Sequence, residues 1–287
     1  MSIFLQQVFN GLTLGSVYGL VALGLTLVYG ILHIPNFAHG ALYMVGAFVS
    51  FYFMQDMGFN YWVAMGGAAV AVAVIAILCE RLVFHPLRHA PPIHDKIAAI
   101  GILLFLEAVV HATWGSQPVR MQSPFPGVIN LGGVFMREQA LVIIIAAAVL
   151  VTALTIFLRK TMVGATIIAM AQNREGAFLV GIDANRVAMM TFAISGVLAA
   201  VAATLFAPMT LVSPVMGHVV IMKAFVIIIL GGMGSIPGAI VGGMIIGMAE
   251  ALGGFYVSDS YKDVIAFGLL VVILSIRPQG LFAKGAH

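Results

Sequence analysis

The first 55 residues contain no Lys, Arg, Asp or Glu, and this uncharged stretch limits the possible folds more than any other feature of the chain. A membrane-spanning helix needs about 20 mostly apolar residues, so the stretch is long enough for two of them. The same character continues, since 62% of the residues are hydrophobic and only 8% are charged. A soluble fold would leave much of this apolar surface in water, at a cost of about 25 cal/mol per Å². The sequence therefore predicts an integral membrane protein.

Further uncharged runs predict an all-α bundle of about eight or nine transmembrane helices. A break that contains Gly and Pro separates the first two spans, and a second break interrupts the run at residues 224–249. The remaining spans are expected at residues 62–79, 97–114, 139–158, 187–207 and 264–276. Little sequence is left over, so we expect a single transmembrane domain over residues 1–287 and no soluble domain.

The placement of the cations predicts the orientation. Lys and Arg concentrate at residues 81–96, 159–186 and 277–284, and an excess of these residues is typical of cytoplasmic loops. With nine spans, the N-terminus lies outside, residues 115–138 form an outer loop, and the C-terminus is cytoplasmic. If either Gly- and Pro-rich break is re-entrant, the number of spans falls and the side of the N-terminus stays open.

The two breaks also predict where a translocation pathway lies. They share a similar Gly and Pro spacing, a faint internal repeat, and paired breaks in apolar segments are typical of transporter pathways. Acids inside apolar runs are costly and often functional, although they can also serve as hydrogen-bonded links between helices. Plain helix packing is the alternative role for the glycines. The candidate pathway residues are Asn36, His39, Gly40, Glu107, Gly231, Gly232, Gly234, Pro237 and Glu250.

Two other charged residues in or near apolar runs are expected to be structural. Glu80 should pair with the neighbouring Arg81 at the cytoplasmic edge of the membrane. Lys223 should extend outward, so that its ammonium reaches the membrane surface.

Signatures of catalysis and of ATP binding are not found in the sequence. It has no Gly-x-Ser-x-Gly or His-Glu-x-x-His motif, and no Gly-x-x-x-x-Gly-Lys-Ser/Thr phosphate loop. We therefore expect a protein that is not an enzyme and binds no cofactor, with any ATP and Mg²⁺ held by a partner chain. No metal is expected either, because Cys79 is the only cysteine. Prolines interrupt the loop that carries His85, His89 and His94, so these side chains would not share one helix face.

Residues 159–186 form a long polar stretch on the predicted cytoplasmic side. Within it, residues 165–182 are expected to form one helix, with an apolar stripe that includes Phe178 and a C-terminus at Gly181. Helices that lie in the lipid interface are usually basic, and this one contains few Lys or Arg. A protein partner in the cytoplasm therefore explains the apolar stripe better than lipid does.

Six segments carry a resemblance to a known family. They are Asn10-Gly11-Leu12-Thr13-Leu14-Gly15-Ser16, Asn36-Phe37-Ala38-His39-Gly40, Ala171-Gln172-Asn173, Gly181-Ile182, Leu230-Gly231-Gly232-Met233-Gly234-Ser235-Ile236-Pro237-Gly238 and Arg277-Pro278-Gln279-Gly280-Leu281-Phe282. Together they resemble the membrane subunits of Liv-type ABC importers for branched-chain amino acids, specifically the shorter, H-type permease. The resemblance runs nearly end to end. One departure is Ile168, where the family usually has Arg, and it concerns one contact to the ATPase.

The resemblance implies a type II-like permease that works inside a larger importer at the bacterial inner membrane. It implies a second, related permease, two cytoplasmic ATPase subunits that bind ATP and Mg²⁺, and a periplasmic substrate-binding protein. Residues 165–182 would be the coupling helix that an ATPase grips, with Ala177 small enough to allow close approach. The implied coupling residues are Ala165, Ala169, Asn173, Glu175, Ala177, Phe178, Gly181 and Ile182.

The expected function is ATP-driven import of branched-chain or related amino acids. The same type of importer could instead carry urea, a short amide, or an aromatic or other carboxylate. A stand-alone ion-coupled carrier or channel is a third possibility, but the sequence has no evident cluster of membrane acids or histidines for a proton relay. The expected surroundings are lipid and protein, without nucleic acid.

Overall fold

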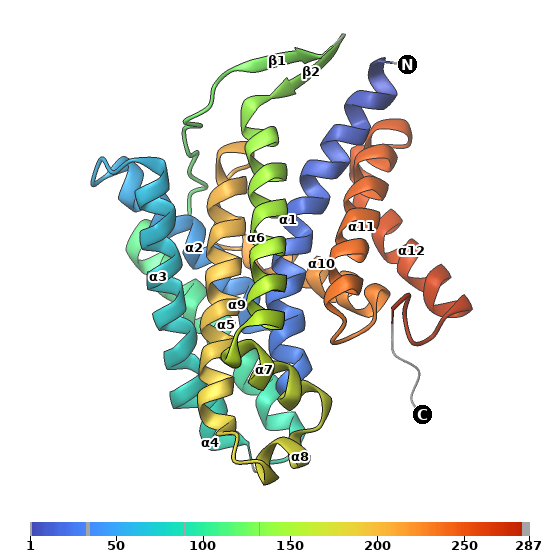
Figure 1. The fold of residues 1–287 in the computed structure, drawn as a ribbon. Coiled ribbons are helices and arrows are strands. Elements are labelled where there is room, and N and C mark those ends of the chain that lie inside the picture. Colours follow the sequence, from blue (N-terminus) through green and yellow to red (C-terminus); the bar gives the residue numbers. More distant parts are fainter. Residues whose placement is uncertain (1, 33–34, 89, 132, 283–287) are drawn as a thin grey trace.

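The computed structural model describes residues 2–32, 35–88, 90–131 and 133–282, which form a helical bundle with one small β-hairpin (Figure 1). Its elements in chain order are α1 (Ser2–Leu32), α2 (Ala38–Gln55), α3 (Tyr61–Cys79), α4 (His85–Leu87), α5 (Pro92–Trp114), β1 (Val128–Leu131), β2 (Val134–Arg137), α6 (Glu138–Lys160), α7 (Met162–Gln172), α8 (Arg174–Leu179), α9 (Ala184–Phe206), α10 (Met216–Gly231), α11 (Ile236–Tyr256) and α12 (Lys262–Ile276). A π-helical turn (Glu80–Phe84) joins α3 to α4, and short 3-10 turns (Ala207–Met209 and Asp259–Tyr261) follow α9 and precede α12.

Several of these helices are long and apolar enough to cross a membrane, which confirms the predicted polytopic helical protein. Among the described residues, six segments meet this criterion: Ile3–Leu32, Tyr61–Leu87, Ile93–Trp114, Glu138–Lys160, Ala184–Met209 and Ile236–Tyr256. The predicted eight or nine spans are not confirmed, because eight would require two of the helices α2, α10 and α12 in addition, and nine would require all three. With 16 and 15 residues, α10 and α12 are only about 22–24 Å long, shorter than the roughly 30 Å of a hydrocarbon core.

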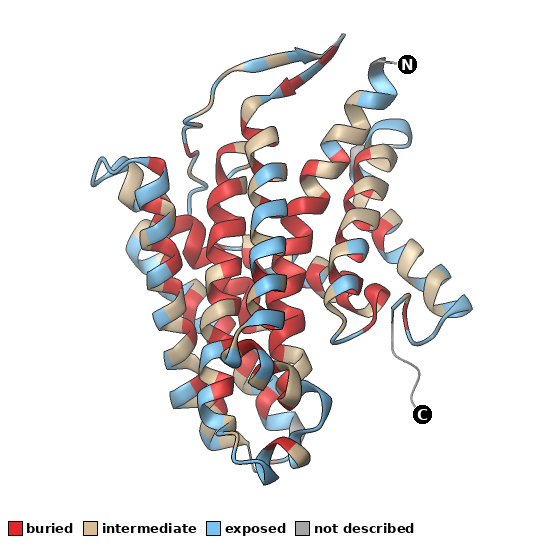
Figure 2. Ribbon diagram, viewed as in Figure 1, coloured by how far each residue is buried: buried red, intermediate tan, exposed pale blue. Residues whose placement is uncertain are grey.

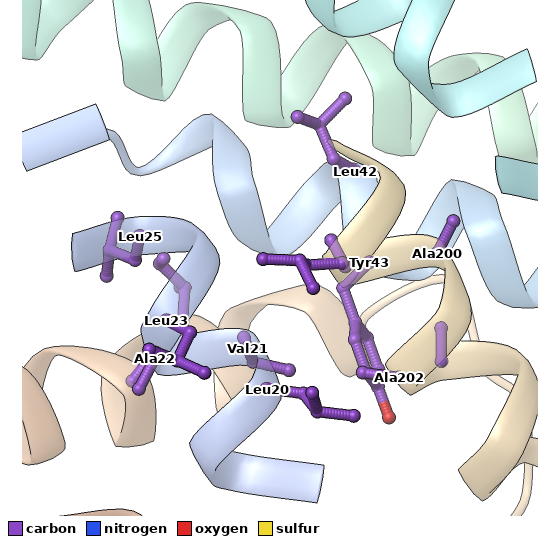
Figure 3. Close-up of a cluster of buried hydrophobic side chains, with 14 of the residues drawn as sticks. Leu20, Val21, Ala22, Leu23, Leu25, Leu42, Tyr43, Ala200 and Ala202 are labelled. Atoms are coloured by element: carbon purple, nitrogen blue, oxygen red, sulfur yellow. The ribbon is translucent and has the colours of Figure 1, made fainter. Parts of the chain in front are cut away.

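α1 and α9 occupy the centre of the bundle. In their most apolar stretches, 83% of the residues of α1 and 67% of those of α9 are buried, against 28% for α3 and α5 and 22% for α6. The outer helices are equally apolar, so their exposed faces suit lipid or another apolar partner (Figure 2). Figure 3 shows part of this core, with the buried side chains of Leu20 and Leu23 from α1, Leu42 from α2 and Ala200 from α9.

α1 and α11 approach each other so closely that only glycine fits between them. A Cβ added to Gly247 of α11 would lie 2.2 Å from the backbone nitrogen of Gly15 in α1. A Cβ on Gly243 would lie 2.7 Å from the Cα of Gly19. Small residues at four-residue spacing permit such contacts between membrane helices. We call these four glycines the α1–α11 seam.

The β-hairpin lies at the same end of the bundle as the start of α1 (Figure 1). β1 and β2 pair antiparallel, with Asn130 opposite Phe135. At the turn, Gly133 has a φ of 92°, and its N–H donates to Oδ1 of Asn130 over 2.9 Å. The N–H of Phe135 donates to the side-chain oxygen of Gln6 over 3.0 Å, which ties the hairpin to α1. The predicted outer loop at residues 115–138 therefore contains ordered structure.

α4, α7 and α8 lie at the opposite end of the bundle (Figure 1). The two loops that the cations placed on one side of the membrane thus share one end, and residues 115–138 lie at the other. Which end faces the cytoplasm remains a prediction from the cations.

Candidate translocation and coupling sites

A pocket of about 260 Å³ lies where α1, α2 and α10 meet the segment between α9 and α10. It is slightly smaller than the roughly 300–1,000 Å³ of sites for drug-sized ligands, so it suits a small solute. Most of its lining side chains are apolar. The lining residues are Val17, Tyr18, Tyr43, Phe206, Thr210, Leu211, Ser213, Val215, Met216, Val219, Val220 and Lys223.

A buried polar cluster adjoins this pocket. The Nζ of Lys223 lies 2.8 Å from Oε2 of Glu250, and it donates to the hydroxyl of Tyr18 over 3.0 Å. The Tyr18 hydroxyl in turn donates to the same Oε2 over 2.8 Å. The side chain of Glu250 is 1% exposed, so its charge would be very costly without these donors. Our expectation that Lys223 extends outward is therefore wrong, because its side chain turns inward to a carboxylate.

A fourth side chain extends the cluster toward the surface. Asp263 in the first turn of α12 lies 3.4 Å from Nζ of Lys223, and its side chain is 65% exposed. The contact with Asp263 is longer than the contact with Glu250. Because Asp263 is exposed, water and salt also screen its attraction to the ammonium more strongly.

The first break starts α2 beside the middle of α1. The fully buried His39 has Nε2 3.0 Å from the carbonyl oxygen of Val21 and Nδ1 3.1 Å from the hydroxyl of Ser195 in α9. A carbonyl can only accept, so Nε2 carries the proton and the serine hydroxyl donates to Nδ1. Asn36 accepts the N–H of Ala38 over 3.1 Å and so caps the start of α2. His39 therefore links three helices and is not part of the pocket wall.

Gly40 sets the position of α10. A Cβ on Gly40 would lie 2.3 Å from the carbonyl oxygen of Gly217, and a Cβ on Gly217 would lie 2.7 Å from the carbonyl oxygen of Gly40. The starts of α2 and α10 therefore touch backbone to backbone. Met216 and Val219, the neighbours of this contact in α10, line the pocket. Gly40 thus borders the pocket through the helix that it positions.

The second break lies at the end of the bundle that holds α7. Gly232 and Gly234 have φ values of 98° and 82°, and Pro237 lies in the first turn of α11. A Cβ on Gly234 would come 3.8 Å from the Cα of Gly30, near the end of α1. A Cβ on Gly30 would in turn come 3.8 Å from the Cβ of Ala171 in α7. This break does not line the pocket described above, and its place in a pathway remains a prediction.

The C-terminal segment is hydrogen-bonded to this second break. The N–H groups of Leu281 and Phe282 donate to the carbonyl oxygens of Leu230 and Gly231 over 2.9 and 3.0 Å. Gly231 and the start of α11 are in backbone contact, since a Cβ on Gly231 would meet the carbonyl oxygen of Gly238 at 2.2 Å. Two of the segments that carry the family resemblance are therefore direct neighbours in the fold.

Glu107 lies on α5 and faces α10. Its Oε2 is 2.7 Å from Nε2 of His218, and its Oε1 is 3.8 Å from Nε2 of His111. Glu107 thus links two helices and does not line the pocket.

Within the described part of the chain, no group of three or more His, Cys, Asp and Glu side chains could hold a metal ion. His89 lies outside the described residues.

The predicted coupling helix at residues 165–182 is not one helix, and that part of the prediction is wrong. Asn173 has φ −153° and ψ 101°, so the chain leaves the helical conformation between α7 and α8. Its side-chain oxygen accepts the N–H of Gly176 over 2.8 Å, as expected for an N-cap asparagine. Thr161 caps α7 in the same way, through the N–H of Gly164. Residues 171–173 thus contain a helix start that the sequence analysis missed.

Gly181 ends α8 as predicted. It has a φ of 82°, and its N–H donates to the carbonyl oxygen of Phe178 over 3.1 Å. The N–H of Ile182 donates to the carbonyl oxygen of Ala177 over 3.1 Å, which completes the pair of bonds typical of a helix end at glycine. The next helix, α9, begins at Ala184.

The exposed part of the coupling region is a short apolar patch. Phe178, Leu179 and Val180 are 72%, 86% and 76% exposed, and we call them the α8 patch. Ala177, expected at the partner surface, is only 4% exposed and packs inside this chain, so that placement is corrected. Of the other coupling candidates, Ala165, Asn173, Glu175 and Gly181 are exposed and Ala169 and Ile182 are partly buried. The run of three apolar residues before Gly181 was a signal that could have identified Leu179 and Val180.

Glu80 pairs with a different cation from the one expected. Its side chain is fully buried and forms an ion pair with Arg88 of the following turn, not with Arg81. Arg88 also donates to the side-chain oxygen of Asn185, in the first turn of α9. The π-helical turn (Glu80–Phe84) brings these groups together, and the pair thereby ties the end of α3 to the start of α9.

These features define a class: a polytopic helical membrane protein with Gly- and Pro-rich breaks between helices, a small pocket and an exposed apolar turn at one end. A solved structure with a similar fold is "PsaBC from Streptococcus pneumoniae in complex with Fab". The match has a TM-score of 0.52 and 14% identity, and it covers 96% of this chain and 92% of that one. At this identity, the likeness shows a shared fold.

Sequence comparison narrows the class to one family. Residues 7–274 match the family described as "Branched-chain amino acid transport system / permease component". The high-affinity branched-chain amino acid permease LivH of Escherichia coli K12 is 40% identical over 98% of this chain and 96% of its own length. LivM of the same organism is 25% identical over 94% of this chain and 68% of its own length. The chain therefore belongs to the family of branched-chain amino acid transport permeases.

Proposed function

We propose that this chain is the membrane permease of an ATP-driven importer that moves branched-chain amino acids across the bacterial inner membrane. The observation that carries this proposal is the near full-length match to LivH, with 40% identity. The pocket has aliphatic lining side chains, Val17, Leu211, Val215, Val219 and Val220, and these support an aliphatic solute. ATP and Mg²⁺ are bound by partner ATPase subunits, and the permease fold is of the type II kind.

The proposed assembly contains a second permease, two cytoplasmic ATPases and a periplasmic binding protein. The two related permeases LivH and LivM of one organism both match this chain, which supports a pair of different permeases. The half-exposed apolar faces of the outer helices offer surface for the second permease as well as for lipid. The cation-rich end with α7 and α8 faces the cytoplasm, and the hairpin end receives the binding protein.

The α8 patch is the proposed contact with an ATPase. Apolar side chains that are exposed at the end of a membrane bundle are outside the hydrocarbon, so a protein groove is their best cover. Motion of the ATPases would shift α7 and α8 and, through residues 180–183, the start of α9. The hydrogen bond from Arg88 to Asn185 and the ion pair of Arg88 with Glu80 would pass this shift to the end of α3.

Phe178→Asp tests this contact in the assembled complex. It should weaken co-purification of the ATPases and reduce ATP turnover stimulated by loaded binding protein, because a charge would enter an apolar groove. The matched control is Phe135→Asp, since Phe135 is 58% exposed at the opposite end and should leave docking intact. Normal docking and turnover with Phe178→Asp would place the coupling surface elsewhere.

Orientation is tested by labelling with an impermeant thiol reagent in a Cys79→Ala background. A cysteine at Val128 should react from outside intact spheroplasts, and a cysteine at Val180 should react only after the membrane is opened. The opposite pattern would invert the proposed topology.

Uptake by the reconstituted complex with its cognate binding protein tests the solute. We expect leucine, isoleucine and valine to be taken up. Uptake of urea, a short amide or an aromatic carboxylate, without uptake of these three, would support the alternative solute of the same importer type.

A further inference from the structure

The pocket between α1, α2 and α10 has one charged lining residue among those that the structure describes. This residue is Lys223, and the hydroxyl-bearing Tyr18 lies beside it. The rest of the wall includes Val17, Val215 and Val219, which present aliphatic surface. A cavity with one cationic side and one aliphatic side matches a solute that carries both a carboxylate and an apolar side chain.

The ammonium of Lys223 is held in a fixed position. Glu250 lies 2.8 Å from Nζ behind the pocket wall and is 1% exposed. The Tyr18 hydroxyl accepts from Nζ over 3.0 Å, and Nζ also lies 5.3 Å from the centre of the Tyr18 ring. The second acidic contact, to the exposed Asp263 at 3.4 Å, is long for a charged hydrogen bond. It is therefore the contact that a competing carboxylate could replace at the least cost.

We propose that this pocket is an amino-acid binding site on the transport route, and this inference rests on the proposed function. The carboxylate of the solute accepts from Nζ of Lys223, in place of Asp263. The Tyr18 hydroxyl, whose proton goes to Glu250, accepts from Nζ and so holds the ammonium in position. The branched side chain lies against Val17, Val215 and Val219. Glu250 is a positioning residue whose carboxylate balances the charge of the ammonium and orients it inside the protein.

Position in the fold also supports a place on the route. The pocket lies at the start of α10, where Gly40 and Gly217 hold the starts of two helices against each other. Helices that begin inside a membrane bundle are the usual surroundings of transporter binding sites. The polar cluster joins α1, α10 and α11, so a solute that engages Lys223 binds a group that links three helices.

The test uses photo-leucine, whose side chain carries the reactive diazirine, in the complete complex reconstituted with its binding protein. During ATP turnover, photo-leucine should label α10 near Val215 and Val219, and excess leucine should abolish the label. Lys223→Met/Glu250→Gln removes both charges and leaves no unpaired buried ion. In this variant the label and leucine uptake should fall by about ten-fold or more, because a charged hydrogen bond to the solute is lost.

Asp263→Asn is the matched control, because it removes only the exposed acidic contact that the solute replaces. It should retain or raise the label. A purely structural ion pair between Lys223 and Glu250 would instead be impaired by either single change and restored by the double variant. Tyr18→Phe is a nearly isosteric change that can be tested if the double variant does not assemble. It should raise the photo-leucine concentration for half-maximal labelling several-fold.

Equal labelling and uptake in the double variant and the parent complex, or labelling confined to other helices, would overturn the site. If Tyr18→Phe left half-maximal labelling unchanged, its hydroxyl would have no part in binding and the site would be overturned as well. A parent complex that takes up no aliphatic amino acid would instead overturn the proposed function, and the site with it.

Discussion

The α1–α11 seam gives a quantitative prediction. Gly247→Ala adds a Cβ that would lie 2.2 Å from the nitrogen and 2.5 Å from the Cα of Gly15. Carbon atoms pack at roughly 3.5–4.0 Å, so the two helices must separate by about 1 Å or more. Overpacking of this kind typically costs about 1–3 kcal/mol. At about 2–4 °C per kcal/mol, the thermal midpoint of the complex in detergent should fall by several degrees.

Gly101→Ala is the matched control for this measurement. Gly101 is also inside a predicted span, on α5, but an added Cβ meets no atom of this chain within 4 Å. Alanine is the better helix former by about 0.5–1 kcal/mol, so this change should be neutral or slightly stabilising. Thermal unfolding followed by fluorescence-detected size exclusion reports both variants. Equal midpoints for Gly247→Ala and Gly101→Ala would refute the close approach of α1 and α11.

Three further changes test other parts of the structure. Arg88→Met should destabilise the complex by about 3–5 kcal/mol, because it leaves the fully buried carboxylate of Glu80 without its cation. In the same thermal assay, Arg88→Met/Glu80→Gln should recover most of that loss. Gly40→Ala should impair uptake while the complex still assembles, since the added Cβ would press on the carbonyl of Gly217 at 2.3 Å and displace the start of α10; normal leucine uptake would contradict this. Ala177→Asp should loosen α8 in this chain, because residue 177 is only 4% exposed and a charge there would be buried. Increased proteolysis of residues 172–182 would report the loosening, whereas an unchanged cleavage pattern would show that the site tolerates a charge.

The ion pairs show where sequence reasoning failed. Lys223 and Glu250 are 27 positions apart, on helices that run in opposite directions around the second break. Snorkelling was a reasonable prediction for Lys223 taken alone, since an isolated lysine in an apolar run reaches for water. The partner became visible only when α1, α10 and α11 were placed together, because the polar cluster draws one residue from each of them.

The coupling region shows a mixed outcome. The helix end at Gly181 followed from local chemistry, because only a residue that readily adopts positive φ fits there. The helix start at Asn173 is also local, but the periodicity of the apolar residues on both sides concealed it. Burial of Ala177 depends on packing of α8 against the rest of the chain, and a small apolar residue is equally compatible with an inner and an outer face.

The sequence by itself determined that this protein lies in a lipid bilayer and that it is built from helices. Uncharged runs of about 20 residues are stable only in hydrocarbon or in a protein interior, and a proline together with several glycines inside such a run favours a break between helices. Tertiary structure alone decided that the first break opens beside the middle of α1 and the second at the end near α7. It also decided that Lys223 faces a pocket, and that Glu80 binds Arg88. These outcomes depend on which helices become neighbours. Close backbone contacts at glycines such as Gly15 and Gly247 set those neighbours, and the sequence alone does not distinguish these glycines from others, such as Gly101, that have open space around them.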